Sequence, residues 1–221
     1  MTSSQAIILI TYAGEFLSSA ELVEVCEKVI AFNLNEISSM MQGTSVLLGV
    51  FKGFVASKYS RDKILMLLIE RISRDVDRLS TNEQCQFVKL LRFVEEEAAV
   101  KVYPDLVPFE TSIEKCLKVV EPYILEQLNH LDFDELKDVY IGYSHPSLSQ
   151  HPELLKVLET RIINLLKTYR ETDLGEFIPI EDIVDMTYEC AVHKAGSQKL
   201  ITSLSSFLDS IMDRILQNGS Q

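Results

Sequence analysis

Apolar residues recur along this chain at the spacing of an α-helix. The clearest stripe lies in segment 60–79 and consists of Leu65, Leu68, Ile72, Val76 and Leu79. Segment 112–131 repeats it with Leu117, Val120, Ile124, Leu128 and Leu131. In both segments the separations are 3, 4, 4 and 3 residues, which places the stripe on one face of a helix. Each segment is therefore predicted to be a long helix with one buried face.

Three further segments, 19–32, 153–169 and 197–216, carry shorter stripes in the same phase. Their members are Val23, Cys26 and Ile30; Leu155, Leu158, Ile162 and Leu166; and Leu204, Phe207, Ile211 and Ile215. The chain is thus predicted to contain five long helices of one kind. A shorter helix is expected before the first of them, in segment 4–14.

The shorter segments between these helices begin with a capping signal. The pairs are Asn33 and Glu36, Ser80 and Glu83, and Asp132 and Glu135. In a capping box the first side chain accepts a hydrogen bond from the first turn, and the Glu side chain returns to the N–H of the cap. A fourth copy keeps Glu181 but places Pro179 at the first helical position, where proline is tolerated.

An apolar set follows each capping acid, as expected for the buried face of a short helix. The sets are Ile37, Met40 and Met41; Phe87, Leu90 and Leu91; Leu136, Val139 and Tyr140; and Ile183, Val184 and Tyr188. Short and long helices therefore alternate, which is typical of helical-hairpin repeats.

This alternation predicts an all-α fold with about five helical hairpins. Their expected ranges are 4–32, 33–79, 80–131, 132–169 and 178–216. Because one hairpin cannot bury its apolar faces alone, we expect the hairpins to stack as a right-handed α-solenoid, with residues 1–221 as a single domain. An ordinary helical bundle is the alternative.

Two features interrupt the regular pattern. Segment 44–59 is long for a connector and either prolongs the second short helix or adds another helix. Pro122 lies inside a stripe and should kink or split that helix near Glu121.

Composition narrows the class of protein. The 221 residues are 47% hydrophobic, enough for a sizeable core, and only 8 Gly and 6 Pro argue against a many-stranded β fold. The net charge of −12 argues against a freely acting nucleic-acid binder and favours protein partners. The widely spaced Cys26, Cys85, Cys116 and Cys190 suggest reduced core cysteines of an intracellular protein.

One zone, 52–92, is basic, with nine Lys and Arg against five Asp and Glu. Arg71, Arg74 and Arg78 share a helix face there, so RNA phosphates could be contacted. The candidate RNA-contacting residues are Lys63, Arg71, Arg74, Arg78, Lys89 and Arg92. The alternative is a solvated face braced by pairs such as Glu70–Arg74. Aromatic residues do not interleave with these charges, so a base-stacking platform is not indicated.

Signals for chemistry are weak. The sequence has no G-x-S-x-G, phosphate-cradling glycine loop or H-E-x-x-H, so we predict no enzyme, catalytic residue, cofactor or metal. Cys190 and His193 lie one turn apart without a second pair, which indicates a core cysteine beside a surface histidine. His145 and His151 are expected in a loop. A membrane span, which needs about 18 apolar residues in succession, is not predicted.

In two places an apolar stripe is followed directly by a helix cap: "VCEKVIAFNLNEISSMM" (25–41) and "ERISRDVDRLSTNEQCQFVKLL" (70–91). This arrangement resembles the degenerate repeats of mitochondrial RNA-metabolism proteins. These are the heptatricopeptide and octotricopeptide repeats and those of FAST-kinase-like and RAP-domain proteins. The resemblance covers about residues 20–216 and implies an α-solenoid acting on organellar RNA. The chain departs from the family in lacking a RAP-like C-terminal region and in being acidic.

The resemblance and the charge together suggest a non-enzymatic adaptor or scaffold. By resemblance it would be a subunit of a mitochondrial ribonucleoprotein assembly, such as a ribosome or an RNA-processing complex. Its partners would be other protein subunits, with RNA contacted through zone 52–92. The alternative is a protein–protein scaffold of another complex without RNA contact. Because no presequence is visible, a cytoplasmic location is the alternative to a mitochondrial one.

Overall fold

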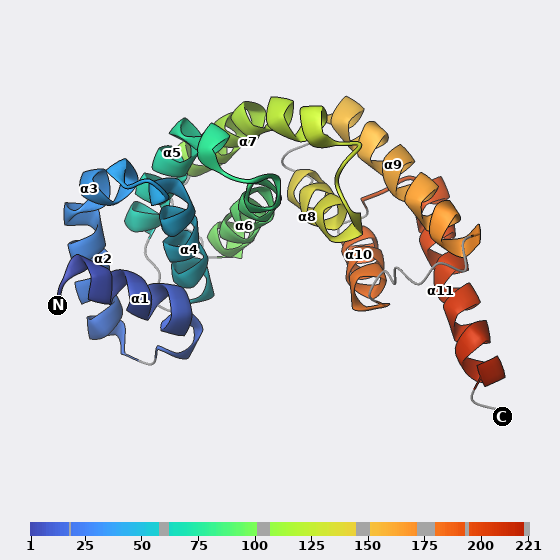
Figure 1. The fold of residues 1–221 in the computed structure, drawn as a ribbon, viewed down its shortest axis with the longest axis horizontal. Helices are drawn as coiled ribbons and strands as arrows, with labels where there is room; N and C mark the ends of the chain where they lie inside the picture. The colour runs from blue at the N-terminus through green and yellow to red at the C-terminus, as the bar shows by residue number, and fades with distance from the viewer. Residues whose placement is uncertain are drawn as a thin grey trace. The chain divides into compact units, whose positions relative to one another are not determined.

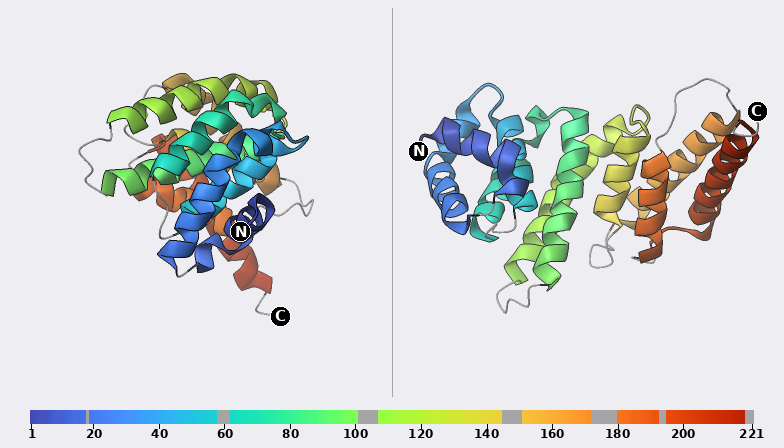
Figure 2. Two further views of the ribbon diagram at one scale, coloured as in Figure 1. Left: turned by 90° about the vertical axis from the view of Figure 1, so that its left-hand side faces the viewer. Right: turned by 90° about the horizontal axis from the view of Figure 1, so that it is seen from below.

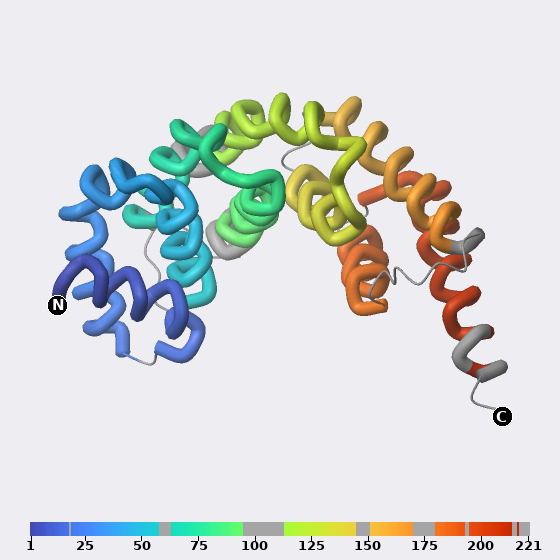
Figure 3. Tube along the Cα trace, viewed as in Figure 1, coloured from blue at the N-terminus to red at the C-terminus, as the bar shows by residue number. Residues whose placement is uncertain are grey.

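In the computed structural model most of the described residues are helical, and none of them lies in a strand (Figure 3). These residues are 1–17, 19–57, 62–100, 107–144, 151–171, 180–192 and 195–218. The predicted all-α class is therefore confirmed. The chain divides into two compact units, unit 1 (Met1–Ile124) and unit 2 (Leu125–Gln221).

Unit 1 begins with α1 (Ser3–Ala13), the 3-10 turn η1 (Gly14–Phe16) and α2 (Ala20–Phe32) (Figure 1). Next come α3 (Leu34–Ser39), α4 (Gly43–Ala56), α5 (Asp62–Arg74) and the 3-10 turn η2 (Val76–Arg78). The last helices are α6 (Thr81–Val100) and α7 (Val107–Gln127), and the boundary between the units falls in the final turn of α7.

The centre of unit 1 is α4, which packs against α1, α3, α5 and α6. Its core-facing side chains include Leu47, Phe51 and Phe54. The Phe51 ring meets that of Phe87 on α6 edge to face, with 5.9 Å between the ring centroids. Segment 44–59 therefore adds a helix between the predicted short and long helices of the second hairpin.

Helices α1 and α4 approach each other at glycines. A Cβ atom on Gly53 would lie 2.1 Å from the carbonyl oxygen of Ile10, and one on Gly14 would lie 2.3 Å from the carbonyl oxygen of Gly53. Both obstacles are backbone atoms, so no rotation of a side chain can make room. At Gly49, one turn earlier, the nearest atom to an added Cβ is the Thr11 methyl carbon at 3.2 Å.

The predicted stripes of the two clearest segments are buried. All members of the 60–79 stripe are 0–5% exposed and all members of the 112–131 stripe are 0–8% exposed. The helix predicted in segment 60–79 is shorter than expected. Helix α5 ends at Arg74, and the turn η2 continues the buried stripe. Pro122 lies inside α7, which continues as one helix to Gln127, so the proline does not split it.

Unit 2 contains α8 (Phe133–Tyr143), α9 (Pro152–Glu171), α10 (Ile180–Val192) and α11 (Gln198–Asn218). The pairs in contact are α8 with α9, α8 with α10, α9 with α11, and α10 with α11 (Figures 1 and 2). Consecutive helices thus form two hairpins that pack on each other. The predicted ranges 132–169 and 178–216 correspond to these hairpins, although Leu154 rather than Leu155 is the buried residue at the start of the α9 stripe.

Buried polar contacts tie the two hairpins of unit 2 together. The Lys137 ammonium on α8 pairs with Asp134 at 2.7 Å and with Asp182 on α10. Burial alone would lower the pKa of Lys137, but hydrogen bonds to the two carboxylates outweigh burial and raise it. This side chain is 5% exposed, and its pairing with Asp182 satisfies the charge within the interface between α8 and α10.

A second link passes through Glu159 on α9. Its Oε1 atom accepts hydrogen bonds from the Tyr140 hydroxyl at 3.0 Å and from the backbone N–H of Ser197 at 2.9 Å. Burial, with the neighbouring Cys190 and Glu159, raises the pKa of Tyr140 well above its usual range, so the phenol remains a donor. One carboxylate therefore holds α8, α9 and the start of α11 together.

Two of the three predicted capping boxes are present. At α8 the Glu135 N–H donates to Asp132 at 2.9 Å and the Asp132 N–H donates to Glu135 at 3.1 Å. Before α6 the Ser80 N–H donates to Glu83 at 2.8 Å, with the return bond at 3.4 Å. Burial would raise the pKa of Glu83, but the hydrogen bonds from Ser80 outweigh burial and lower it.

The capping box predicted at Asn33 is wrong. Asn33 is the only residue between α2 and α3, and its amide donates back to the Val29 carbonyl oxygen at 2.7 Å. The side chain therefore closes the end of α2 instead of opening α3. A box that the prediction missed does occur at Thr2 and Gln5, before α1.

Replacing Gly53 by alanine is expected to destabilise unit 1, because the new Cβ would force α1 away from α4. Overpacking typically costs about 1–3 kcal/mol, and the gain in helix propensity from Gly to Ala, about 1 kcal/mol, offsets only part of it. Gly49→Ala is the matched control: it gains the same helix propensity but meets only the side chain of Thr11, so it should be neutral or slightly stabilising. Urea unfolding followed by circular dichroism would measure both. Equal stability of the two variants would contradict the close approach.

Candidate interaction surfaces

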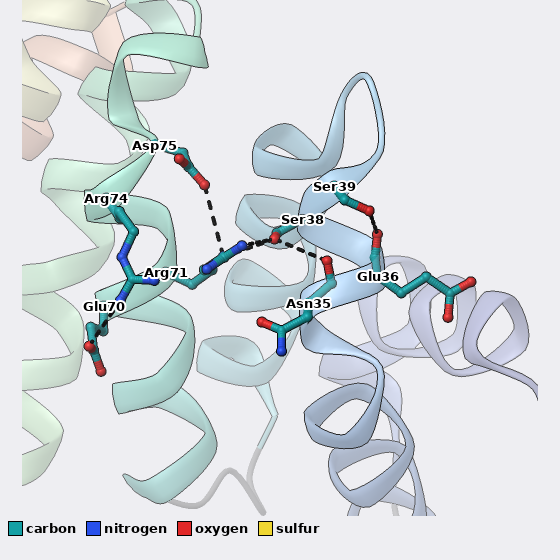
Figure 4. A network of polar contacts seen from close by, with 8 residues as sticks. All are labelled: Asn35, Glu36, Ser38, Ser39, Glu70, Arg71, Arg74 and Asp75. Carbon is teal, nitrogen blue, oxygen red and sulfur yellow. Dashed lines mark hydrogen bonds and ion pairs between the residues drawn. The ribbon is translucent and has the colours of Figure 1, made fainter.

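The predicted RNA-contacting residues of zone 52–92 have different surroundings in the structure. Arg71 is an internal link between α5 and α3, as Figure 4 shows. Its Nε atom donates to the Ser38 hydroxyl at 2.8 Å, its Nη2 atom donates to the same oxygen, and Asp75 lies at 3.9 Å. Since Ser38 is buried, the Arg71 guanidinium is engaged in holding the two helices together.

Arg92 and Lys89 on α6 are less exposed than the prediction requires. Arg92 is 1% exposed and is one of the largest fully buried side chains of the structure. Lys89 is half-buried. Neither residue adds a fully exposed cation to the surface of α6.

Three of the six candidates are exposed: Lys63 and Arg74 on α5, and Arg78 in η2. Arg74 pairs with Glu70 at 3.3 Å, as the interpretation of a braced, solvated face predicts (Figure 4). The pair is open to solvent on both sides, so its contribution to stability is small. Of the six candidates, only these three side chains are exposed to an anionic partner.

The described residues contain no cluster of three or more His, Cys, Asp or Glu able to hold a metal ion. A pocket of about 210 Å³ lies between α5 and α7 beside Cys116, and another of about 190 Å³ lies between α9 and α11. Both are smaller than the roughly 300–1,000 Å³ of typical small-molecule sites. Burial raises the pKa of the Cys116 thiol, which keeps it protonated and poorly nucleophilic.

The remaining candidates for chemistry are Cys190 and three histidines. Cys190 is 2% exposed, as predicted for a core cysteine, while His193 and His145 lie outside the described residues. His151 lies outside the helices, just before α9, as predicted, but it is buried, and its ring meets that of Tyr143 edge to face at 5.0 Å between centroids. All four cysteines are buried, and none of them forms a disulfide bond with another.

An apolar surface on α1 and η1 was not predicted from the sequence. Ile8, Tyr12 and Phe16 are 59%, 79% and 80% exposed and follow one another at intervals of four residues. On the opposite face of α1, Ala6 and Ile10 are fully buried. The available signal was the sequence of α1 itself, "SSQAIILITYA", which has no charged residue and is apolar on both faces.

Some apolar residues predicted to be in the core lie on the surface. On α10 only Ile183 of the predicted apolar set is buried, while Val184 and Tyr188 are 48% and 63% exposed. After α3, Met40 and Met41 are 46% and 99% exposed. Each of these helices therefore buries a narrower face than the sequence suggested.

Among the described helices, none combines the length and apolarity that crossing a membrane requires. Comparison of the chain with protein-family models, curated proteins and solved structures found no match. The class of protein defined by the described residues is therefore an all-α protein with exposed apolar helix faces.

Replacing Arg71 by methionine is expected to lower the free energy of unfolding of unit 1 by about 1.5–3 kcal/mol, the usual contribution of a hydrogen bond to a charged group. Arg74→Met, one turn further along α5, is the control and should change stability by less than about 0.5 kcal/mol, since its ion pair is solvated. Chemical denaturation of both variants tests this difference. A stable Arg71→Met protein would mean that the guanidinium does not hold α3.

Proposed function

We propose that the protein is a non-enzymatic α-helical adaptor that holds other protein subunits in a larger assembly. The observation that carries this proposal is the exposed apolar face of α1 and η1, formed by Ile8, Tyr12 and Phe16. Exposed aromatic and aliphatic side chains in a contiguous row are typical of protein–protein contact sites.

The construction of α1 supports this role. A helix without charged residues is ordinarily covered on all sides, whereas α1 packs on α2 and α4 and leaves its far side open. The glycine contact with α4 fixes the helix backbone, so its outer side chains are presented on a rigid support. Rigid presentation lowers the entropy cost of association.

The finer arrangement and the cellular setting belong to the proposal as well. We propose that the hairpins extend as a right-handed α-solenoid. The resemblance of segments 25–41 and 70–91 to mitochondrial RNA-metabolism repeats favours membership of a mitochondrial ribonucleoprotein assembly. The net charge of −12 favours contact with the protein subunits of such an assembly over direct contact with its RNA.

The adaptor function predicts that mutation of the outer face of α1 removes a partner while leaving the fold intact. The variant Ile8→Ser with Tyr12→Ser should recover at least one partner subunit about tenfold less well than the wild type, because the apolar anchors of an interface dominate its affinity. Affinity purification from cells that naturally make the protein, with quantitative mass spectrometry, is the measurement.

The matched control for that experiment is Val119→Ser on α7, which changes an apolar residue that is 46% exposed on another surface of unit 1. Circular dichroism should show the same unfolding midpoint for all three proteins. A wild-type protein recovered only as a monomer, with a turnover activity, would contradict the adaptor function.

RNA contact is the second candidate function, and the exposure of Lys63, Arg74 and Arg78 on α5 and η2 favours it. If each of these side chains contacts one phosphate of a single strand, the logarithm of the binding constant should fall with the logarithm of the salt concentration, with a slope of about −2. Replacing all three residues by Glu should abolish binding of a single-stranded RNA of about 20 nucleotides, measured by fluorescence anisotropy at low salt. Lys28→Glu on α2 is the control. Absence of wild-type binding at low salt would remove this candidate.

A further inference from the structure

Helix α10 of unit 2 has a second apolar face that its own fold does not use. Ile183, Met186 and Cys190 are buried at 0–2% exposure and pack toward α8 and α11. On the opposite side, Val184 and Tyr188 are 48% and 63% exposed, and Val192 is 51% exposed. The intervals of four residues align these three side chains along the outer face of the helix.

The charges on α10 are all negative. The helix "IEDIVDMTYECAV" contains Glu181, Asp182, Asp185 and Glu189 and no Lys or Arg. Asp182 is already engaged by Lys137 of α8. Glu181 and Asp185 are exposed and lie beside the apolar row, about one turn apart from each other.

The geometry points to a basic amphipathic helix of another protein as the occupant of this face. Leu, Ile or Met side chains of such a helix would pack on Val184, Tyr188 and Val192, and its Lys or Arg residues would meet Glu181 and Asp185. A helix of about three turns suffices, because the row from Val184 to Val192 extends over about 12 Å. This inference rests on the proposed adaptor function and names the chemistry of one partner.

Charge decides between this occupant and a second copy of the chain. Two α10 faces packed on each other would bring acidic rows together, in a protein whose net charge is already −12. Like charges facing each other across an interface disfavour association, whereas a basic partner is both attracted and aligned. Tyr188 sits in the middle of the row, where residues that dominate binding energy are usually found.

The probe for this inference is a synthetic helical peptide of about 15 residues with Leu at intervals of three and four and Lys elsewhere. Two further peptides separate the contributions of charge and face: one has the same composition in an order without an apolar face, and one has Glu in place of Lys. Fluorescence anisotropy should show micromolar binding of the first peptide, with at least about tenfold weaker binding of the other two.

Variants of the protein locate the binding to α10. Tyr188→Ser and Asp185→Lys should each weaken binding of the Leu–Lys peptide by about tenfold. The matched controls in unit 2 are Val157→Ser on α9, which is 41% exposed, and Glu126→Lys on α7, an exposed acid. Both controls should change binding by less than about twofold, and circular dichroism should show that all four variants remain folded.

Several results would overturn the inference. Equal binding of the reordered peptide would mean that only net charge is sensed, and equal weakening by the control variants would place the site elsewhere. Sedimentation showing a dimer that Tyr188→Ser dissociates would assign the face to a second copy. If Tyr188→Ser retains every partner that the wild type recovers from cells, the α10 site is wrong while the adaptor function stands.

Discussion

The backbone contact between α1 and α4 is the constraint on which unit 1 depends. At Gly53 the two helices approach so closely that a single methyl group would collide with the carbonyl oxygen of Ile10. Because α4 also packs against α3, α5 and α6, the helix that α1 meets is held from several sides. The approach buries Ala6 and Ile10 and leaves the opposite side of α1 facing solvent.

Much of this fold could be predicted because most helices bury a single stripe. Leu68 and Ile72 on α5, or Val120 and Ile124 on α7, repeat at the helical period, and that period survives even where α5 gives way to a 3-10 turn. The central helix α4 was harder to predict because it is covered on several sides, so its sequence shows an apolar run without one clear face. The capping boxes could not all be predicted from the sequence either. Because α2 ends at the residue before Asn33, this residue has no room to open α3.

The candidate site could be predicted less well, because a sequence gives the charge of a side chain but not its surroundings. Arg71 and Arg74 are three residues apart, yet the first bonds to the buried Ser38 and the second meets only a solvated carboxylate. Arg92 carries the same charge into the interior. Similarly, the apolar character of Tyr188 or Met41 does not indicate whether a neighbouring helix covers it, and the structure leaves both exposed.

The exposed faces of α1 and α10 differ in the charge of the residues beside their apolar side chains. The outer face of α1 is flanked by uncharged residues of its own helix, with the acid Glu15 of η1 beside Phe16, so its selectivity for a partner rests mainly on shape and apolar contact. The outer face of α10 combines apolar residues with Glu181 and Asp185, so charge can exclude acidic partners there. The net charge of −12 opposes self-association of either face. The adaptor that we propose would therefore present two chemically different faces to its partners, one on each unit.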